Sequence, residues 1–599
     1  MNPNDILNNE NLNYGIIGNC KSAALINADS SIDWCCLPQF DSPSIFANIL
    51  DNDIGGSFKI LCDSSYVLSQ NYCNKTSILI TNFSNKTNEF EVHDFMPRYQ
   101  KESGVYYSPP EIIRFFKLIK GKPKFNILYD PRLEYSNGET NNFIKDDFVV
   151  SVVDYENHDT LYLYTDFDKS KFLNSEELVL SKNHFVSITY YEKINSFNIK
   201  DSLFEFEKTK VYWRNWCDKT PSFELYNDQI IRSAITLKLL TFEKTGAVLA
   251  AATTSLPETI GEERNWDYRF CWIRDASMVI KVFTKLGHQK IVKNFINYIL
   301  NLIPDKNEKL QIMYGIDGNK NLTEKTLDYL KGYKNSSPVR IGNAAFIQKQ
   351  NDIYGILMDA IHYQILKFNQ DNDKHEELWS IVKSIVWVVQ NNWSLPDKGI
   401  WEFRNEDKHF TFSKVLCWVA IDRAIKVSEI IQNGISARKW RPLRDKIFDD
   451  IMKNAWNKKV GAFTQSYNSN YLDASVLLME TYGFISPKSP KYIKTVKVIE
   501  KELSVNGLMF RYKNDDDFGS PSSSFTVCSF WLIDSLFKIG EEDKAKKMFD
   551  KLLNYGNHLQ LFSEDIDFKS KRLLGNFPQA YSHLALINTA IKFNLKHNE

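Results

Sequence analysis

The sequence predicts two domains, an N-terminal antiparallel β-sandwich followed by an (α/α)6 barrel. Three observations predict this order. Period-two alternation fills about the first 200 residues, apolar positions at three- and four-residue intervals dominate the rest, and long loops recur about once per predicted helix pair. A chain of 599 residues is also too long for a single hydrophobic core. We expect the sandwich at 1–205, a helical linker at 206–225 and the barrel at 226–599.

Short strands rich in β-branched and aromatic residues predict the sandwich. The segments SILITNF, FEVHDFMP, EIIRFFKLI and FVSITYYEKI alternate apolar and polar positions. Turn signals separate such segments, among them Asn137-Gly138 and Gly121-Lys122-Pro123. Strands of this kind bury one face, so two sheets packed face to face are expected.

About twelve helices are predicted after residue 225. They span 226–246, 275–287, 289–303, 342–368, 374–393, 413–432, 438–456, 472–482, 490–504, 524–539, 541–553 and 577–594. Twelve helices pair into six hairpins, and a barrel of hairpins gathers its connecting loops at one end. A helical solenoid is the competing arrangement, but the sequence has no fixed-period repeat.

Composition excludes several function classes. Lys+Arg and Asp+Glu both number 74, so no charge excess favours nucleic acid or an anionic membrane as a partner. There is no apolar run of about 20 residues, and the start lacks the basic and apolar regions of a signal peptide. The nine cysteines are scattered, without a CxxC pair or Cys/His cluster. We therefore expect no metal, no cofactor, no membrane span and a cytoplasmic location.

The segment RNWDYRFCWIRDA, residues 264–276, concentrates charges and aromatic rings. It holds two tryptophans, three arginines and two aspartates. Charged side chains are rarely buried unless they are paired and hydrogen-bonded, so this composition predicts a polar pocket with aromatic walls. A ligand with many hydroxyls and apolar ring faces, such as a sugar, suits that pocket. A structural Arg/Asp network with aromatic packing is the alternative.

Two glutamates have the chemistry that glycoside hydrolysis needs. Glu402 stands between Trp401 and Phe403, and an apolar neighbour raises a carboxyl pKa, as a general acid requires. Glu564 lies in a predicted loop, LQLFSEDIDF. Glycoside hydrolysis takes one carboxyl that donates a proton and a second that activates water or attacks the sugar. The two glutamates are 162 positions apart, so they can act on one bond only if the fold brings their loops together. The alternative is that both are surface acids.

Long motifs across nearly the whole chain carry a resemblance to a known family. They are GNCKSAALINADSSIDWCCLPQFDSPSIF, DFMPR, RNWDYRFCWIRDA, GNAAFIQKQNDIYG, GIWEFR, HFTFSKVLCWVAIDRA, LDAS, CSFWLID, SEDID and GNFPQAYSHLALIN. The chain resembles glycoside hydrolase family 15, which contains glucoamylases, glucodextranases and microbial trehalases. The resemblance implies a β-sandwich before an (α/α)6 barrel, and inversion at the anomeric carbon. By motif position it implies that Glu402 is the general acid and Glu564 the general base.

The other site candidates are predicted to bind substrate, and they are Trp266, Arg274, Asp275, Trp401, Arg404, His409 and Lys414. The resemblance implies that Arg274 and Asp275 hold hydroxyls of the terminal glucose, since charged hydrogen bonds orient a sugar strongly. A structural role for His409 is left open. Two departures from the family pattern, Ile356 in NDIYGILMDA and the serine-rich FGSPSSSFTVCSFW, affect outer subsites and thus the substrate.

The predicted function is an inverting, exo-acting α-glucoside hydrolase that releases β-glucose from non-reducing ends. Glucoamylase-like action on α-glucans or maltooligosaccharides is the main prediction. Trehalose hydrolysis by a trehalase of the same family is the first alternative. A non-catalytic carbohydrate-binding protein on the same scaffold is the alternative from another class, although such a protein would need neither glutamate.

Overall fold

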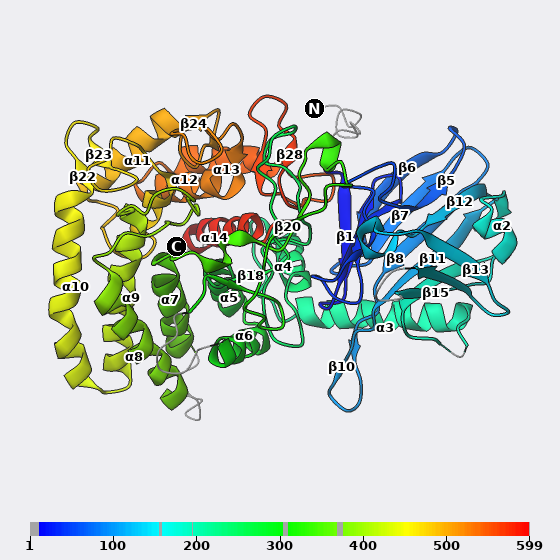
Figure 1. Cartoon of the computed structure of the whole chain (residues 1–599), viewed down its shortest axis with the longest axis horizontal. Coiled ribbons are helices and arrows are strands. Elements are labelled where there is room, and N and C mark those ends of the chain that lie inside the picture. Colours follow the sequence, from blue (N-terminus) through cyan, green and yellow to red (C-terminus); the bar gives the residue numbers. More distant parts are fainter. Residues whose placement is uncertain (1–10, 155–158, 195, 303–309, 368–374, 598–599) are drawn as a thin grey trace.

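The computed structural model describes residues 11–154, 159–194, 196–302, 310–367 and 375–597 (Figure 1). The prediction about a signal peptide falls largely on residues 1–10, which lie outside this range. The described chain has an N-terminal domain of antiparallel sheets followed by a helical domain, as the sequence predicts.

Two antiparallel sheets form the N-terminal domain. The order is β1-β2-β3-β5-β12-β16 in one sheet, with β4 paired to β3, and β13-β14-β15-β17-β11-β8-β7-β6 in the other. Alternating burial along β7, in the pattern buried then half-buried, shows one face turned to the core. The strands are β1 Tyr14–Gly18, β2 Ala23–Asn27, β3 Ile32–Cys36, β4 Ser44–Phe46, β5 Ser57–Leu61, β6 Val67–Tyr72, β7 Leu79–Ser84, β8 Glu89–Phe95, β11 Glu111–Lys120, β12 Lys124–Asp130, β13 Thr140–Ile144, β14 Val149–Val153, β15 Thr160–Thr165, β16 Leu178–Val179 and β17 His184–Tyr190.

A long helix, α3 (Ile199–Cys217), follows the last strand and contacts β11 and β17. It also contacts β9 (Tyr99–Gln100), which pairs with β10 (Tyr106–Tyr107) in a separate hairpin. Two short helices, α1 (Leu133–Ser136) and α2 (Lys169–Leu173), lie within the sandwich sequence. Most of the predicted linker, 206–225, is therefore helix α3 packed on the sandwich, and the domain boundaries themselves stay a prediction.

The helical domain consists of an inner ring and an outer layer. The inner elements contact one another in a closed circle, α5-α7-α9-η5-α12-α14 and back to α5. Each inner element also contacts the outer helix next to it in sequence or, for α14, the first helix α4, giving the pairs α4·α14, α5·α6, α7·α8, α9·α10, η5·α11 and α12·α13; α9 also contacts α8, and α12 also contacts α11. Six such pairs around a closed ring are the (α/α)6 barrel that the sequence predicts. The elements are α4 Asn227–Leu239, α5 Ile273–Lys285, α6 Gln289–Leu302, α7 Asp352–Lys367, α8 His375–Asn392, α9 Thr411–Ile430, α10 Gly434–Asn454, η5 Ala474–Met479, α11 Pro490–Leu503, α12 Thr526–Lys538, α13 Glu542–Leu553 and α14 Ala580–His597.

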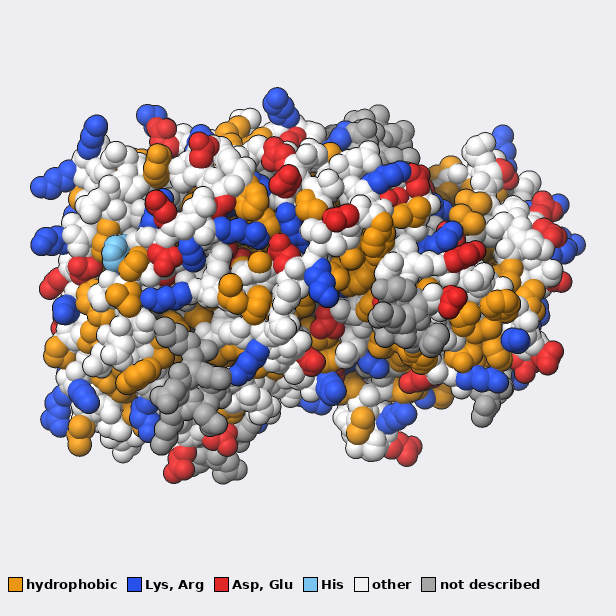
Figure 2. Space-filling model, in the orientation of Figure 1, with side chains coloured by type: hydrophobic (Ala, Val, Ile, Leu, Met, Phe, Trp, Pro, Cys, Tyr) orange, Lys and Arg blue, Asp and Glu red, His pale blue; other side chains and the backbone are white. Residues whose placement is uncertain are grey.

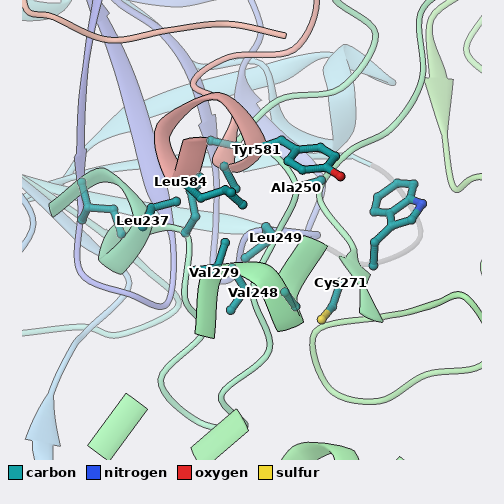
Figure 3. Packing of buried hydrophobic residues seen from close by; sticks show 14 of the residues in the cluster. Leu237, Val248, Leu249, Ala250, Cys271, Val279, Tyr581 and Leu584 are labelled. Atoms are coloured by element: carbon teal, nitrogen blue, oxygen red, sulfur yellow. The ribbon is translucent and has the colours of Figure 1, made fainter. Parts of the chain in front are cut away.

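The barrel core forms from apolar positions at helical spacing. In α5, Ile273, Ala276, Ile280 and Phe283 are all buried. Figure 3 shows how side chains from α4, α5 and α14, including Leu237, Val279 and Leu584, gather in one cluster. The inner ring is therefore held by packing between helices that are far apart in sequence.

Three helix predictions differ from the structure. The segment 226–246 is helical only to Leu239, since Thr241 pairs with Val248 in an isolated β-bridge. The segment 342–368 begins as a 3-10 turn, η3 (Ala344–Ile347), and is α-helical only from Asp352. The segment 472–482 is the 3-10 helix η5. In each segment most of the apolar residues are buried, as the pattern predicts, but part of the segment is a loop or a 3-10 turn or helix, and buried parts of this kind also require apolar side chains.

Short strand pairs stiffen the loops before the inner helices. Antiparallel pairs are β18·β19, β20·β21, β22·β23, β24·β25, β26·β27 and β27·β28. These loops are therefore ordered structures around one end of the barrel. The strands are β18 Cys271–Trp272, β19 Met313–Tyr314, β20 Lys325–Thr326, β21 Arg340–Ile341, β22 Trp456–Asn457, β23 Ala462–Phe463, β24 Ser504–Val505, β25 Leu508–Met509, β26 Ser524–Phe525, β27 Asp565–Ile566 and β28 Leu573–Leu574; a further 3-10 turn is η2 Tyr333–Asn335.

The two domains share one hydrophobic core. A single cluster of buried residues includes Trp34 of β3 and Leu237 of α4. The Trp34 indole donates a 2.9 Å hydrogen bond to the carbonyl oxygen of Ala252. Arg269 donates to the carbonyl oxygen of Ser42 (3.0 Å) and to the Tyr135 hydroxyl (2.8 Å). The junction is therefore packed and hydrogen-bonded.

On the face shown in Figure 2, charged side chains of both signs are interspersed, in keeping with the formal net charge of zero. Among the helices that the structure describes, no stretch has both the length and the apolar character needed to cross a bilayer.

Candidate active site

A pocket lies at the N-terminal ends of the inner barrel elements. Its lining comes from the loops that precede α5, α7, α9 and α12 and from the start of α14. The amino ends of helices carry partial positive charge, which favours carboxylates and sugar hydroxyl oxygens there. Six residues predicted from the sequence line this pocket, and they are Trp266, Arg274, Asp275, Trp401, Glu402 and Arg404.

Arg274 and Asp275 occupy the first turn of α5. The Arg274 guanidinium donates to Oδ1 of Asp275 (2.9 Å) and to Oε1 of Gln350 (2.9 Å), and it lies 3.4 Å from Asp352. Both side chains are nearly fully buried, and burial raises the pKa of Asp275. A buried pair fixed by these contacts presents its remaining donors and acceptors to a ligand in a set geometry.

Glu402 stands in a tight turn before α9. Its φ of 61° lies in the left-handed region, which costs a residue with a Cβ on the order of 1 kcal/mol. The Trp272 indole donates a 2.8 Å hydrogen bond to Oε1 of Glu402, and Arg274 approaches the same oxygen at 3.8 Å. Burial raises the pKa of Glu402, although Arg274 opposes this shift. The carboxyl is therefore biased toward its protonated form.

Glu564 precedes β27 and is 1% exposed. The Tyr268 hydroxyl donates a 2.6 Å hydrogen bond to its Oε1, and the backbone N–H of Asn576 donates to Oε2 at 3.4 Å. Gly575 fits beside it only as glycine, because a Cβ there would lie 2.7 Å from Oε2 of Glu564. Burial and the nearby charge of Glu258 raise the pKa of Glu564 to about 8. Tyr268 lines the pocket, so its hydroxyl connects Glu564 to the pocket wall.

A buried carboxylate cluster surrounds Glu564. Oxygens of Glu258, Glu564 and Asp565 lie within 4.8 Å of one another, and among the described residues this is the group with spacing suited to a metal ion. Arg511 already neutralises Glu258 through two hydrogen bonds of 3.0 and 2.8 Å. Burial and the neighbouring carboxylates raise the pKa of Asp565. The cluster therefore holds protons more tightly than isolated carboxylates do.

Aromatic rings form much of the pocket wall. The Trp401 indole donates to Oδ2 of Asp473 (2.9 Å) and packs edge-on against Phe525, with 5.4 Å between ring centroids. The guanidinium carbons of Arg340 and Arg404 each lie 4.5 Å from the centroid of the Trp266 ring. Fixed rings beside fixed charges suit a ligand with apolar faces and many hydroxyls.

The structure places three sequence candidates outside the pocket lining: Glu564, which is hydrogen-bonded to the lining residue Tyr268, and also His409 and Lys414. His409 stacks on Tyr467 at 5.7 Å between ring centroids. The Lys414 ammonium is buried in α9 and donates to the carbonyl oxygens of Trp393 and Leu395 at 2.6 and 2.5 Å. Both residues follow Glu402 closely in sequence, but Lys414 is buried within α9 and the half-buried His409 lies just before this helix. They are accordingly not among the residues that the pocket brings together.

Sequence reasoning missed several pocket residues. Tyr268 and Trp272 are the donors to Glu564 and Glu402, and Glu258 and Arg511 form the buried ion pair beside them. The aromatic-rich segment 264–276 was the available signal for the first two. Nothing in the local sequence marks Glu258, which gains its importance from a partner 253 positions away.

The arrangement can move protons at two places. Glu402 and Glu564 come from different loops, and each has one oxygen tied to an aromatic donor. Burial raises the pKa of both carboxyls, and two carboxyls at one site are the groups that acid–base cleavage of a glycosidic bond uses.

Comparison with known proteins identifies both domains. The family model described as "Glycosyl hydrolases family 15" matches residues 224–591. A second model, described as "Trehalase-like, N-terminal", matches residues 11–158. These two matches together span most of the described chain.

Curated relatives match nearly end to end. A protein named "Trehalase" from Thermoplasma volcanium is 34% identical over 97% of this chain and 93% of its own length. Another "Trehalase", from Mycolicibacterium smegmatis, is 33% identical over 96% of this chain and 90% of its own. Among solved structures, a bacterial glucoamylase complexed with acarbose superimposes with a TM-score of 0.71 over 98% of this chain and 94% of that chain. At 12% identity, this last likeness shows a shared fold.

Proposed function

The chain belongs to glycosyl hydrolase family 15, and on that premise we propose that this glycoside hydrolase is an inverting trehalase with Glu402 as general acid and Glu564 as general base. The relatives that match both domains carry the name trehalase, which favours the alternative over the main prediction of glucoamylase-like action. The likeness to a glucoamylase concerns the fold, so it does not weigh against trehalose.

One geometric observation supports the catalytic roles. Tyr268 and Trp272 belong to one segment, their rings lie 5.3 Å apart, and each donates to a different carboxylate of the pair. Glu402 lines the pocket and Glu564 does not, but both are held by neighbouring rings that line it. In an inverting enzyme the two carboxyl groups are about 6.5–9.5 Å apart, which leaves room for a water molecule.

The proposed reaction balances one proton gained against one lost. Protonated Glu402 gives its proton to the glycosidic oxygen as the bond from that oxygen to the anomeric carbon breaks. Glu564, in the form that is ionised above its pKa of about 8, takes a proton from water, whose oxygen bonds to the anomeric carbon from the opposite face. Arg274 and Asp275 hold hydroxyls of the glucose whose bond is cleaved.

Trehalose makes inversion directly visible. Its two α-anomeric carbons share one oxygen, so inversion at one carbon releases one β-glucose and one α-glucose per molecule. Purified protein should be tested against trehalose, maltose, isomaltose, maltotriose and starch, with the released anomers read by proton NMR before they interconvert. Equal α- and β-glucose from trehalose supports the proposal. Two α-glucoses would contradict inversion, and starch as the best substrate would restore the glucoamylase-like prediction.

A further inference from the structure

A segment of the loop before α12 borders the pocket, and we call residues 511–519 the mouth segment. Asp516, Asp517 and Phe518 line the pocket together with Trp266 and Arg404. The mouth segment leads into a serine-rich stretch, SPSSS at 520–524. Since the proposed general acid and base use other loops, the mouth segment has a separate role.

The mouth segment is fixed to the loop before α5. Arg264 donates to both carboxylate oxygens of Asp516 at 2.8 and 2.6 Å, and to the carbonyl oxygen of Gly519 at 2.7 Å. Tyr512 donates to Asp516 as well, at 2.5 Å. The Arg264 and Asp516 side chains are 4% and 7% exposed, so water competes little for this bidentate pair.

A second set of hydrogen bonds joins the mouth segment to the turn that contains Glu402. The Asp517 carboxylate accepts the backbone N–H groups of Arg404 and of Asn405, the latter at 2.9 Å. These two amides stand two and three positions after Glu402. The mouth segment thus ties together the wall that carries Trp266 and the wall that carries Glu402.

Between these two sets of hydrogen bonds, the rings of Phe518 and Trp266 pack with the guanidinium group of Arg404. Phe518 packs edge-on against Trp266, with ring centroids 5.1 Å apart. The guanidinium carbon of Arg404 lies 4.5 Å from the Trp266 centroid and 5.4 Å from that of Phe518. Three side chains from three loops therefore meet at the pocket boundary.

We infer that Asp517 and Phe518 determine specificity by limiting the pocket to a substrate of two sugar rings. The inference rests on the proposed function. In exo-cleavage the terminal glucose enters first, so the rest of a longer glucan must pass out through the mouth. A third ring would have to displace Phe518 or break the Asp517 contacts, whereas trehalose ends at its second ring. The loop therefore excludes α-glucans from a site whose chemistry could cleave them.

The test compares chain length in wild type, Phe518→Ala and Asp517→Asn. Phe518→Ala removes the ring at the mouth. Asp517→Asn keeps the size of the side chain but weakens its hydrogen bonds with the backbone amides of Arg404 and Asn405. Trp387→Ala is the matched control, because Trp387 is 61% exposed on α8 and absent from the pocket lining. For each protein kcat/KM is measured on trehalose, maltose and maltotriose, with thermal unfolding as a check of folding.

We expect the ratio of kcat/KM for maltotriose to that for trehalose to rise at least tenfold in Phe518→Ala, less in Asp517→Asn and not in Trp387→Ala. An unchanged ratio in both mouth variants overturns the inference, as does a wild type that cleaves maltotriose as well as its best disaccharide. If wild type cleaves maltose but not trehalose, the proposed function fails. The ratio of maltotriose to maltose then decides the inference by the same criteria.

Discussion

The Tyr268 hydroxyl donates a 2.6 Å hydrogen bond to Oε1 of Glu564, while its ring packs 5.3 Å from Trp272, the donor to Glu402. One short stretch of chain therefore orients both proposed catalytic groups. Neither aromatic residue needs to contact the reacting atoms to affect the rate, since a shift of this stretch changes the position and the pKa of both carboxyls.

Replacing Tyr268 with Phe should lower kcat about 10- to 100-fold, the effect of losing a hydrogen bond to a charged group. The hydrogen bond from Tyr268 lowers the pKa of Glu564, so without it that pKa rises. The acidic limb of the kcat/KM profile, which requires ionised Glu564, should move to higher pH. Tyr467→Phe is the control, because Tyr467 makes a comparable 2.9 Å hydrogen bond to Asp450 outside the pocket lining. Equal pH profiles in the two variants would contradict a positioning role for Tyr268.

Replacing Glu258 with Gln should move the same limb in the opposite direction. The negative charge of Glu258 raises the pKa of Glu564, and its partner Arg511 lowers it. Glu258→Gln removes the first charge and leaves Arg511 uncompensated, so both effects lower the pKa of Glu564. The acidic limb should therefore shift to lower pH, and a full pH–rate profile measures this. A shift upward would show that Glu258 does not set the ionisation of the proposed base.

Separate Glu402→Gln and Glu564→Gln variants should each lose about 10²- to 10⁴-fold in kcat. Glu406→Gln tests the effect of an amide in the same loop, since the Glu406 side chain is 78% exposed. A fluoride leaving group needs little protonation, so Glu402→Gln should keep activity on α-glucosyl fluoride while Glu564→Gln loses it. The reverse pattern would exchange the two roles.

A stability prediction concerns Glu111 in the sandwich. Burial raises the pKa of Glu111 to about 8, while the Ser187 hydroxyl donates a 2.6 Å hydrogen bond to it. Because the folded pKa lies above the unfolded value, stability from this group is present at low pH and is lost as pH rises toward 8. Glu111→Gln resembles the protonated form, so its free energy of unfolding relative to wild type should increase by on the order of 4 kcal/mol between pH 4 and pH 9.

The measurement is unfolding followed by circular dichroism at several pH values. Glu177→Gln serves as the control, because Glu177 is an exposed glutamate of the same domain paired with Lys124. A stability difference between Glu111→Gln and wild type that does not change with pH would contradict the raised pKa of Glu111.

The spacing of apolar residues predicts the fold class, because each strand or helix must bury one face and its apolar residues repeat with the period of that element. The period-two segments became the strands of two sheets, and the apolar spacing at 226–599 became the barrel elements. The ends of these elements were less predictable. Thr241 leaves the helical pattern because it pairs with Val248, and such a pairing leaves no mark in a window of neighbouring residues.

The part of the candidate site that comes from a single sequence motif was predictable. Arg274 and Asp275 are adjacent and both line the pocket. His409 and Lys414 follow Glu402 in the sequence, but they contact Tyr467 and the carbonyl oxygens of Trp393 and Leu395 outside the pocket lining. The arginines of segment 264–276 also have different roles that only the fold decides: Arg274 lines the pocket, whereas Arg269 donates hydrogen bonds to the sandwich.

The Asp267–Arg269 pair makes the sandwich part of the catalytic scaffold. Arg269 is 1% exposed, and two of its hydrogen bonds end on Ser42 and Tyr135. Arg269 lies five positions before Arg274. A barrel without its sandwich would keep the Arg269 guanidinium but lose its acceptors on Ser42 and Tyr135. In this chain the helical domain is therefore expected to depend on its sandwich, and a chimera made from it should exchange the two domains as one unit.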